Sequence, residues 1–313
     1  MISVAIAVFN GADYISEQLL SIVNQSVKPH EIIISDDGSS DDSINIAKKV
    51  LDGSDIAYKI ISNKYSRGFS NNFQSALEHC IGDVVFLSDQ DDFWMPDKIE
   101  KSIGKAASVN KYLIIHDMFI GDAKLVINDK TYLEEMILNS INSDDYCAGC
   151  AMLIKRELLD LALPFPARLK DHDIWINEIA KYIDQRALLK LPLSIYRRHG
   201  SNLTTSQIFV RSKLDNAISS LKEQWSGEFF YRQKMLIEEM LLRFNERRCV
   251  LMSIVNVDDV LLDLNVALSI INTRINCKRL GAVSRLYCVA KQYGKSKIGV
   301  RHALKDIFIG IHR

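Results

Sequence analysis

Short apolar runs alternate with amphipathic segments along the first part of the chain. Four of these runs are rich in β-branched residues and predict buried strands, at Ile2–Val8, Glu31–Ser35, Ala57–Ser62 and Asp83–Leu87. Between the runs, apolar residues recur at helical spacing, as in the segment from Tyr14 to Gln25. Repeated strand–helix units of this kind predict an α/β fold with a parallel sheet and right-handed crossovers.

The alternation continues less regularly to about residue 205. It predicts further strands at Tyr112–His116, Cys147–Ile154, Arg186–Leu191 and Leu193–Arg197, and helices at 96–109, 131–140, 155–162 and around Trp175. From about Ile208 to Ile311 the periodicity is helical and strand signals are absent. We therefore expect an α/β domain of residues 1–205 and a helical domain of residues 206–313.

Two of the predicted strands end in clusters of carboxylates. Asp89, Asp91 and Asp92 follow the fourth strand within the stretch Ser88–Trp94. Like charges this close raise each other's pKa, and a hard divalent cation such as Mg²⁺ or Mn²⁺ relieves their repulsion. Ligands bind at the carboxyl ends of strands in open α/β sheets, where this cluster lies. A solvated turn before the helix that Pro96 begins is the alternative interpretation.

The second cluster, Asp36-Asp37-Gly38-Ser39-Ser40-Asp41-Asp42, follows the second strand. Gly38 permits a tight turn, and we expect Ser39 or Ser40 to cap the next helix. Farther along, the chain carries Lys170-Asp171-His172-Asp173-Ile174-Trp175 and Tyr196-Arg197-Arg198-His199-Gly200-Ser201-Asn202. Both segments hold groups that serve in proton transfer or in metal binding.

In their order, these segments resemble the family 2 glycosyltransferases of the GT-A fold. The resemblance rests on VAIAVFNGADYISEQLLSIVNQS, IIISDDGSSDDS, VVFLSDQDDFWMPDKI, HDIW and YRRHGSN. It covers roughly residues 1–203 and leaves out the last third of the chain. Bacterial enzymes of cell-surface polysaccharide synthesis, including rhamnosyltransferase-like members, are most similar. A Rossmann-like, mostly parallel sheet flanked by helices is the fold that this resemblance implies.

The resemblance also implies roles for residues on the donor side. Phe9 and Asn10 would line the nucleotide base, and Asp36 or Asp37 would bind the base or ribose. Asp89 would approach the ribose. We group these with the other expected donor-binding residues, Arg67 and Gln90. The donor expected is a UDP- or dTDP-sugar, and the acceptor a glycan or a lipid-linked saccharide.

For the chemical step, the resemblance implies that Asp91 binds Mn²⁺ or Mg²⁺, with His199 as a further metal or diphosphate ligand. Asp173 matches the catalytic base. The sequence departs from the family at His172, where Glu is common, and at Gln90, where a small residue is common. The physical chemistry agrees, because a cation stabilises a leaving diphosphate and an attacking hydroxyl needs a base.

Simpler interpretations remain open for several of these residues. Asp171 and Asp173 could serve the N-terminus of a helix, and His199 could be a structural histidine. The arginines could contact diphosphate or pair with surface acids; these are Arg67, Arg197 and Arg198. Trp94 and Trp175 could stack on a sugar, although packing in the core is the ordinary role of such residues.

Composition describes an ordinary folded protein, with 313 residues, 48% hydrophobic and 25% charged. Its zero net charge is unevenly distributed, because the segment from Arg274 onward carries ten Lys/Arg and one Asp. Residues 297–311 predict a basic amphipathic helix that would bind an anionic membrane surface, a second copy of the chain or the preceding helices. Nucleic acid is not expected as a partner, since no binding motif accompanies this charge.

The length and composition of the apolar runs do not predict a membrane span, since the longest uncharged run is Met1–Ala12. Cys147 and Cys150 have the spacing of a redox or zinc motif, yet no second pair accompanies them, and we interpret them as small buried residues. These features favour the cytoplasm, with peripheral binding to the inner face of the membrane.

The sequence therefore predicts a metal-dependent inverting glycosyltransferase that uses a nucleotide-sugar. Two alternatives remain open: a metal-dependent phosphohydrolase or nucleotidyltransferase built on the same acidic clusters, and a protein that binds nucleotide or glycan without turnover.

Overall fold

The computed structural model describes residues 1–139, 141, 143–168, 170–200 and 227–277. The chain divides into two compact units, residues 1–213 and 214–313. The boundary expected between residues 205 and 206 falls outside the described residues. Each unit is described by itself below.

Four parallel strands form the first half of the sheet, in the order β3-β2-β1-β4. They are β1 (Ile2–Val8), β2 (Glu31–Asp36), β3 (Ala57–Ser62) and β4 (Val84–Ser88). The connecting helices are α1 (Ile15–Val23), α2 (Ser43–Asp52) and α3 (Phe69–Leu77). The predicted strand–helix units are thus confirmed. The predicted cap of α2 is wrong, because the helix begins at Ser43 after Asp42.

The second half of the sheet is mixed and continues in the order β8-β6-β9-β5, with β7 paired to β6. These strands are β5 (Phe93–Trp94), β6 (Leu113–Gly121), β7 (Ile127–Thr131), β8 (Met152–Lys155) and β9 (Arg186–Arg197). Only the β6–β9 pair is parallel in this half. The two strands predicted on either side of Pro192 are one strand, whose pairing with β6 shifts register near that proline.

The strand predicted at Cys147–Ile154 is mostly wrong, because a 3-10 turn, η2 (Gly149–Ala151), precedes the four residues of β8. The remaining short elements of this unit follow the predicted pattern, apart from a second 3-10 turn, η1 (Ser143–Asp145). They are α4 (Lys98–Val109), α5 (Tyr132–Leu138), α6 (Arg156–Ala162) and α7 (His172–Tyr182). Thr131 and Glu134 form a capping box that starts α5.

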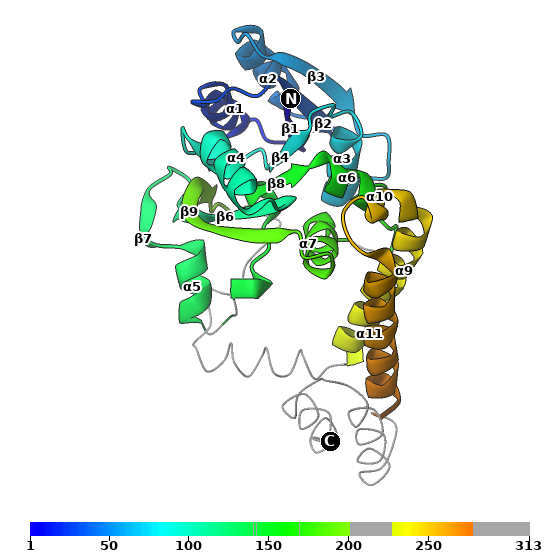
Figure 1. Ribbon diagram of the computed structural model, residues 1–313. Helices are drawn as coiled ribbons and strands as arrows, with labels where there is room; N and C mark the ends of the chain where they lie inside the picture. The colour runs from blue at the N-terminus through cyan, green and yellow to red at the C-terminus, as the bar shows by residue number, and fades with distance from the viewer. Residues whose placement is uncertain (140, 142, 169, 201–226, 278–313) are drawn as a thin grey trace. The chain divides into compact units, whose positions relative to one another are not determined.

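The core lies on both faces of this sheet, because successive strand residues point to opposite sides. Helices α1, α2 and α4 pack on one face against alternate residues of β1, β2 and β4. Figure 1 shows α3, α6 and α7 on the other face. Trp94 and Trp175 are fully buried, which confirms their interpretation as core residues. Packing on both faces thus sets the positions of the residues at the carboxyl ends of the parallel strands.

The described part of the second unit is entirely helical, as predicted. It consists of α9 (Gly227–Glu246), α10 (Arg248–Met252) and α11 (Val257–Cys277), and α9 and α11 pack along one another (Figure 1). Within the described residues, no helix combines the length and apolar character that crossing a bilayer requires. The basic helix expected at residues 297–311 lies outside the described residues.

Candidate active site

Three chain segments leave the sheet at the same edge, because β2, β1 and β4 are parallel neighbours. Val8 pairs with Asp36 and Ile6 pairs with Ser88, so the residues that follow these strands emerge side by side. They supply the Phe9 loop (residues 9–12), the Asp36 turn (residues 36–42) and the Asp89 turn (residues 88–92). The structure thus brings most of the expected donor-binding residues to one place.

Asp91 and His199, the two expected metal ligands, lie in contact although 108 residues separate them. His199 Nε2 is 2.9 Å from Asp91 Oδ2, and both side chains are largely buried. The Tyr14 ring stacks on the imidazole at a centroid distance of 4.5 Å and orients it. His199 therefore lies beside the acidic cluster, and its two interpretations, metal ligand and hydrogen-bonded structural histidine, both stay predictions.

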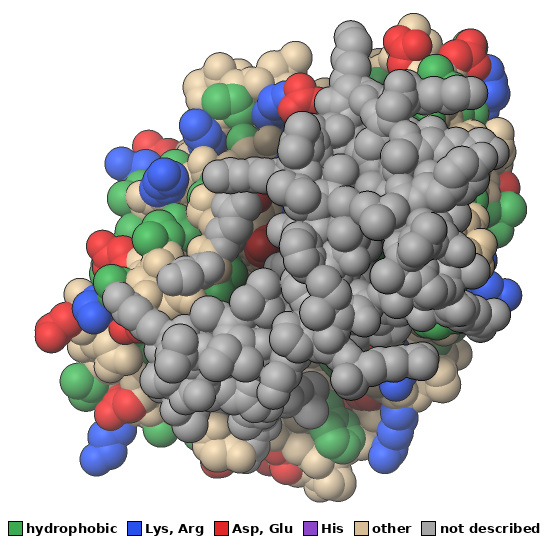
Figure 2. Space-filling view, turned by 90° about the horizontal axis from the view of Figure 1, so that it is seen from below, with side chains coloured by type: hydrophobic (Ala, Val, Ile, Leu, Met, Phe, Trp, Pro, Cys, Tyr) green, Lys and Arg blue, Asp and Glu red, His purple; other side chains and the backbone are tan. Residues whose placement is uncertain are grey.

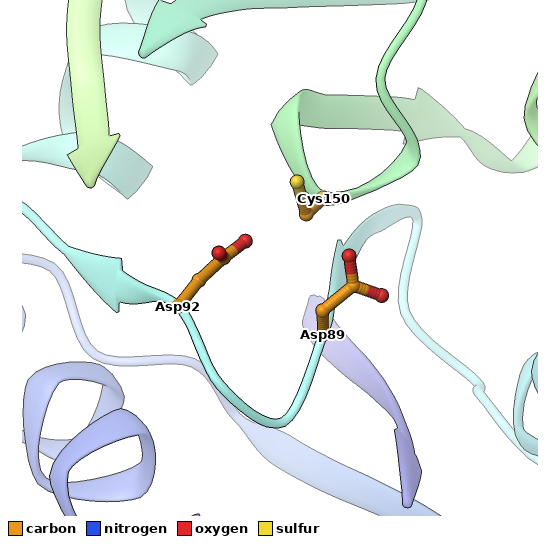
Figure 3. A group of neighbouring side chains, drawn as sticks. All are labelled: Asp89, Asp92 and Cys150. Atoms are coloured by element: carbon orange, nitrogen blue, oxygen red, sulfur yellow. The ribbon is translucent and has the colours of Figure 1, made fainter. Parts of the chain in front are cut away.

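Asp89, Asp92 and Cys150 form a compact group, in which the two carboxylates extend from the ends of the Asp89 turn toward Cys150 (Figure 3). One ligand atom from each lies within 4.8 Å of the others. Burial and the neighbouring carboxylates raise the pKa of Asp89 well above its usual value, with the charge of Asp92 the largest of those neighbours. Burial, and then the charge of Asp91, raise the pKa of Asp92 to about 7.

These residues fit a divalent cation. Oδ2 of Asp92 is buried and has no hydrogen-bond donor within normal distance among the described residues, and the carboxylate oxygens are the hard ligands that Mg²⁺ and Mn²⁺ prefer. Asp92 and Cys150 were not assigned roles from the sequence. Cys150 is a buried free thiol, as predicted, but its sulfur atom lies beside two carboxylates rather than among apolar side chains alone.

A buried lysine lies beneath the acidic group. Lys98 is completely buried at the start of α4; its Nζ donates to the Cys150 carbonyl at 2.7 Å and lies 3.8 Å from the Trp94 ring centroid. Burial lowers the pKa of Lys98 to about 7, while the charges of Cys150 and Asp92 oppose that shift. No sequence signal marked Lys98, because its position resembles the polar first turn of any surface helix.

Arg197 holds the Asp89 turn in place from the end of β9. Its buried guanidinium donates to the carbonyls of Asp91 and Ala123, at 2.7 and 2.8 Å, and to Glu17 Oε2 at 2.6 Å. Its backbone N–H donates to Asp92 Oδ1 at 3.3 Å. Arg197 therefore does pair with a surface acid, Glu17, although its own side chain is only 2% exposed.

Asp173 approaches the same site from the first turn of α7. Its charge is among those that raise the pKa of Asp89, and its Oδ1 accepts the N–H of Ile174 at 2.8 Å. Asp171, the residue at the N-cap, makes no side-chain capping bond. A Cβ atom at Gly149 would lie 3.5 Å from the Asp173 Cβ and 3.1 Å from His172 Nε2, so a larger residue there would press on the His172 ring.

His172 fixes the position of α7 rather than facing solvent. It stacks on Phe73 at 4.5 Å and contacts the rings of Phe69 and Phe165. Burial lowers its pKa, so the imidazole is neutral at pH 7 and packs as an aromatic ring. The His172 that replaces the family's Glu therefore orients the helix that carries Asp173.

The expected nucleotide-binding residues lie at the more exposed side of this edge. The Phe9 ring is 45% exposed, and the Arg67 guanidinium carbon lies 5.6 Å from its centroid. Asp36 Oδ1 accepts from Ser39 N at 3.0 Å, whereas Asp37 accepts from Asn63 Nδ2 at 2.7 Å. Gly38 has φ 86°, as the predicted tight turn requires.

The other two expected donor-binding residues, Asn10 and Gln90, also form hydrogen bonds that involve the main chain. Asn10 Oδ1 accepts from Ser40 N at 2.8 Å, and Asn10 N donates to Ser39 Oγ at 2.9 Å. The Gln90 amide makes two hydrogen bonds with the main chain of Phe9. These contacts tie the Phe9 loop to both acidic turns.

The surface that Figure 2 shows carries Lys/Arg and Asp/Glu side chains interspersed around its described rim. Such mixing is typical of an ordinary solvated surface.

Comparisons with known proteins identify glycosyltransferases among the relatives of this chain. The putative glycosyltransferase EpsE of Bacillus subtilis (strain 168) is 27% identical over 232 residues, 69% of this chain and 79% of that protein. WfgD of Escherichia coli, a UDP-Glc:alpha-D-GlcNAc-diphosphoundecaprenol beta-1,3-glucosyltransferase, is 23% identical over 73% of this chain and 86% of its own length.

Among solved structures, S. aureus TarS 1-349 in complex with UDP-GlcNAc aligns over 98% of this chain and 90% of its own, with a TM-score of 0.55 and 16% identity. The mannosyltransferase PcManGT of Pyrobaculum calidifontis, solved with GDP-Man and Mn²⁺, aligns over 98% and 84%, with a TM-score of 0.52. These likenesses confirm the GT-A fold. The sequence model described as Glycosyl transferase family 2 matches residues 3–160. The chain belongs to that family.

Proposed function

We propose that this glycosyltransferase is metal-dependent and inverting, and that it transfers a hexosyl group from a nucleoside diphosphate sugar to a saccharide acceptor. The observation that carries the proposal is the meeting of the Asp89 turn with His199 and Asp173 at the carboxyl edge of the sheet. Carboxylates that raise each other's pKa in a buried site favour binding of a cation.

In this mechanism, Asp91 and His199 would hold Mn²⁺ or Mg²⁺, with Asp89 and Asp92 beside them. The bound cation supplies stabilisation of the negative charge that develops on the leaving diphosphate. Arg197 keeps the Asp89 turn fixed, so that its carboxylates need not reorganise during the reaction. Phe9 and Arg67 offer an exposed ring and a cation to the base and phosphates.

Asp173 is the candidate general base, acting at its carboxylate oxygens. It comes from α7, far in sequence from the Asp89 turn, and accepts the proton of the acceptor hydroxyl as that hydroxyl attacks. A single displacement from the face opposite the diphosphate inverts the anomeric centre. His172, packed among phenylalanines, keeps this carboxylate in position.

The names of the relatives suggest substrates for the first experiments. WfgD is named for transfer of glucose from UDP-Glc to a diphosphoundecaprenol-linked sugar, and TarS was solved with UDP-GlcNAc. We infer a UDP- or dTDP-hexose as donor and a lipid-linked saccharide as acceptor, in surface polysaccharide synthesis at the cytoplasmic face of the membrane. The basic C-terminal segment would attract the protein to anionic lipid or mediate self-association.

Transfer from a labelled nucleotide-sugar tests the proposal. Purified protein is incubated with Mn²⁺ and labelled UDP-Glc, UDP-GlcNAc or a dTDP-hexose, with and without a diphospholipid-linked saccharide. We expect labelled lipid to form only when both acceptor and metal are present. Phosphate released from the nucleotide without acceptor would instead indicate a phosphohydrolase, and nucleotide binding without turnover a non-catalytic protein.

A further inference from the structure

Gln90, the middle residue of the Asp89-Gln90-Asp91 sequence, bonds to the Phe9 loop through both atoms of its amide. Phe9 N donates to Gln90 Oε1 at 2.9 Å, and Gln90 Nε2 donates to the Phe9 carbonyl at 3.0 Å. The Gln90 amide thus pairs with both the N–H and the C=O of Phe9, as the main chain of an adjacent β-strand would. The amide is therefore engaged with protein rather than held out toward a ligand.

Gly11 makes this arrangement possible by leaving space. A Cβ atom at position 11 would lie 2.4 Å from Gln90 Oε1 and 2.5 Å from its Cδ. The φ angle of Gly11 is not positive, so its backbone conformation is open to alanine, but the alanine Cβ would displace the Gln90 amide. The glycine and the glutamine thus act as one unit.

This contact links two parts of the site with different tasks. On one side, Gln90 lies between two carboxylates that a cation would bring into a single arrangement. On the other, Phe9 presents an exposed ring under the Arg67 guanidinium. The conformation of the Asp89 turn is therefore transmitted directly to the main chain of the Phe9 loop.

We propose that Gln90 is a positioning residue that couples cation binding at the Asp89 turn to nucleobase binding at Phe9. The inference rests on the proposed function, since it needs a nucleotide and a cation. Arg197 anchors the main chain of the turn, and a cation relieves repulsion among its carboxylates and so orders their side chains. Gln90, between these carboxylates, then holds the Phe9 loop in its base-binding form. Because such linkage is reciprocal, the base must in turn raise the affinity for the cation.

A nucleoside without phosphates isolates this coupling, because it offers no diphosphate to the cation. A first screen compares UDP, dTDP and GDP, each with Mn²⁺, and identifies the diphosphate that most stabilises the protein. Calorimetric titration then measures the affinity for the corresponding nucleoside with and without saturating Mn²⁺. We expect Mn²⁺ to tighten nucleoside binding about fivefold or more in the wild-type protein.

Two variants remove the coupling from opposite sides. Gln90→Met keeps the length of the side chain but loses both hydrogen bonds, and Gly11→Ala displaces the amide. In each variant, Mn²⁺ should change the nucleoside affinity by less than about twofold. The double variant should show no further loss of this Mn²⁺ effect than either single variant. Gln25→Met is the control, because Gln25 also bonds to main chain, at Met95 and Ile99, outside the site.

The outcomes separate this inference from the function beneath it. If none of the diphosphates binds with Mn²⁺, the proposed function itself fails, and the coupling with it. If a diphosphate binds in a Mn²⁺-dependent way but the nucleoside affinity ignores Mn²⁺, or Gln90→Met retains the effect, the coupling role is overturned while the function stands. A loss of the effect in Gln25→Met would show that general destabilisation explains it.

Discussion

The two acidic turns at the edge of the sheet are alike in sequence and opposite in how their charges are balanced. In the Asp36 turn, the carboxylates of Asp36 and Asp37 accept hydrogen bonds from Ser39, Asn63 and the N–H of Gly68. In the Asp89 turn, Asp89 and Asp92 lie mainly against one another and a thiol, and their pKa values are raised. The carboxylates of the first turn are thus balanced by protein groups, whereas we propose that those of the second bind a cation.

This difference shows why counting carboxylates does not identify a metal site. Hydrogen bonds from N–H groups stabilise the charged form of a carboxylate, whereas burial beside another carboxylate opposes it. Only the second arrangement stores an electrostatic cost that binding can relieve. Predictions for the two turns should accordingly differ in their dependence on metal and pH.

The largest effect is expected at Asp173, which acts together with the Asp89 turn. Asp173→Asn keeps the size of the side chain and an oxygen for the Ile174 N–H, but it cannot accept the acceptor's proton. Transfer should fall about 10²–10⁴-fold, while Mn²⁺-dependent donor affinity stays near wild type. The rate of nucleoside diphosphate release at saturating substrates measures this.

Asp171→Asn is the matched control, because it makes the same chemical change two residues away, at an N-cap whose side chain makes no capping bond. It should retain wild-type activity. If Asp173→Asn keeps more than about a tenth of the activity, the role of general base passes to another group. Asp117 is a poor successor, since its carboxylate already accepts the N–H groups of Met118 and Leu133.

The next effect is expected at Asp91. Asp91→Asn removes a charged ligand next to His199, so Mn²⁺-dependent affinity for nucleoside diphosphate should fall more than about tenfold. The melting temperature without metal should not fall, because removing one crowded charge relieves repulsion. Calorimetry with and without Mn²⁺ tests both statements, with Asp97→Asn, at a half-buried position whose side chain pairs with Lys101, as control. Undiminished affinity would remove Asp91 from the metal site.

Asp92 allows a test by pH. Its pKa is raised from 3.8 to about 7, so folding favours its protonated form. The protonated carboxyl therefore contributes to the stability of the fold below about pH 4, and this contribution is lost as the pH rises through about 7. Without metal at pH 8, Asp92→Asn should melt higher than wild type by roughly 5 °C, and the difference should vanish near pH 4. Saturating Mn²⁺ should remove the advantage, and a constant difference across pH would contradict the assigned cause.

Much of this comparison could be predicted from the sequence, because its signals are local. Apolar runs identify strands buried on both faces, and the carboxyl ends of parallel strands must meet, which places Asp36 and Asp89 at one edge. The roles of Asp91, His199 and Asp173 came from the family resemblance. The structure places Asp91 and His199 in contact, and their ligand roles remain predictions.

What could not be predicted depends on contacts between distant segments. Lys98, Asp92 and Cys150 meet only after β4, α4 and η2 have packed, so neither the acidic cluster nor the spacing of Cys147 and Cys150 indicates that they lie together. Strand β5 has two residues, too few for any periodicity, and β7 is largely exposed and shows no apolar alternation. Such elements are specified by their partners rather than by their own pattern.

The smallest effect is expected in the Asp36 turn. Asp37 accepts from Asn63 Nδ2 and from Gly68 N at 2.9 Å, and so anchors the loop that carries Arg67. Asp37→Ala should lower stability by about 1 kcal/mol, or about 2–4 °C in melting temperature. Because these partners are protein groups, the loss should be the same with and without Mn²⁺. Melting curves of wild type and variant under both conditions measure this, with Asp37→Asn, which keeps one acceptor oxygen, as a milder variant. If Asp37→Ala instead abolishes the stabilisation by Mn²⁺, the Asp36 turn belongs to the cation site, and the contrast between the two turns is wrong.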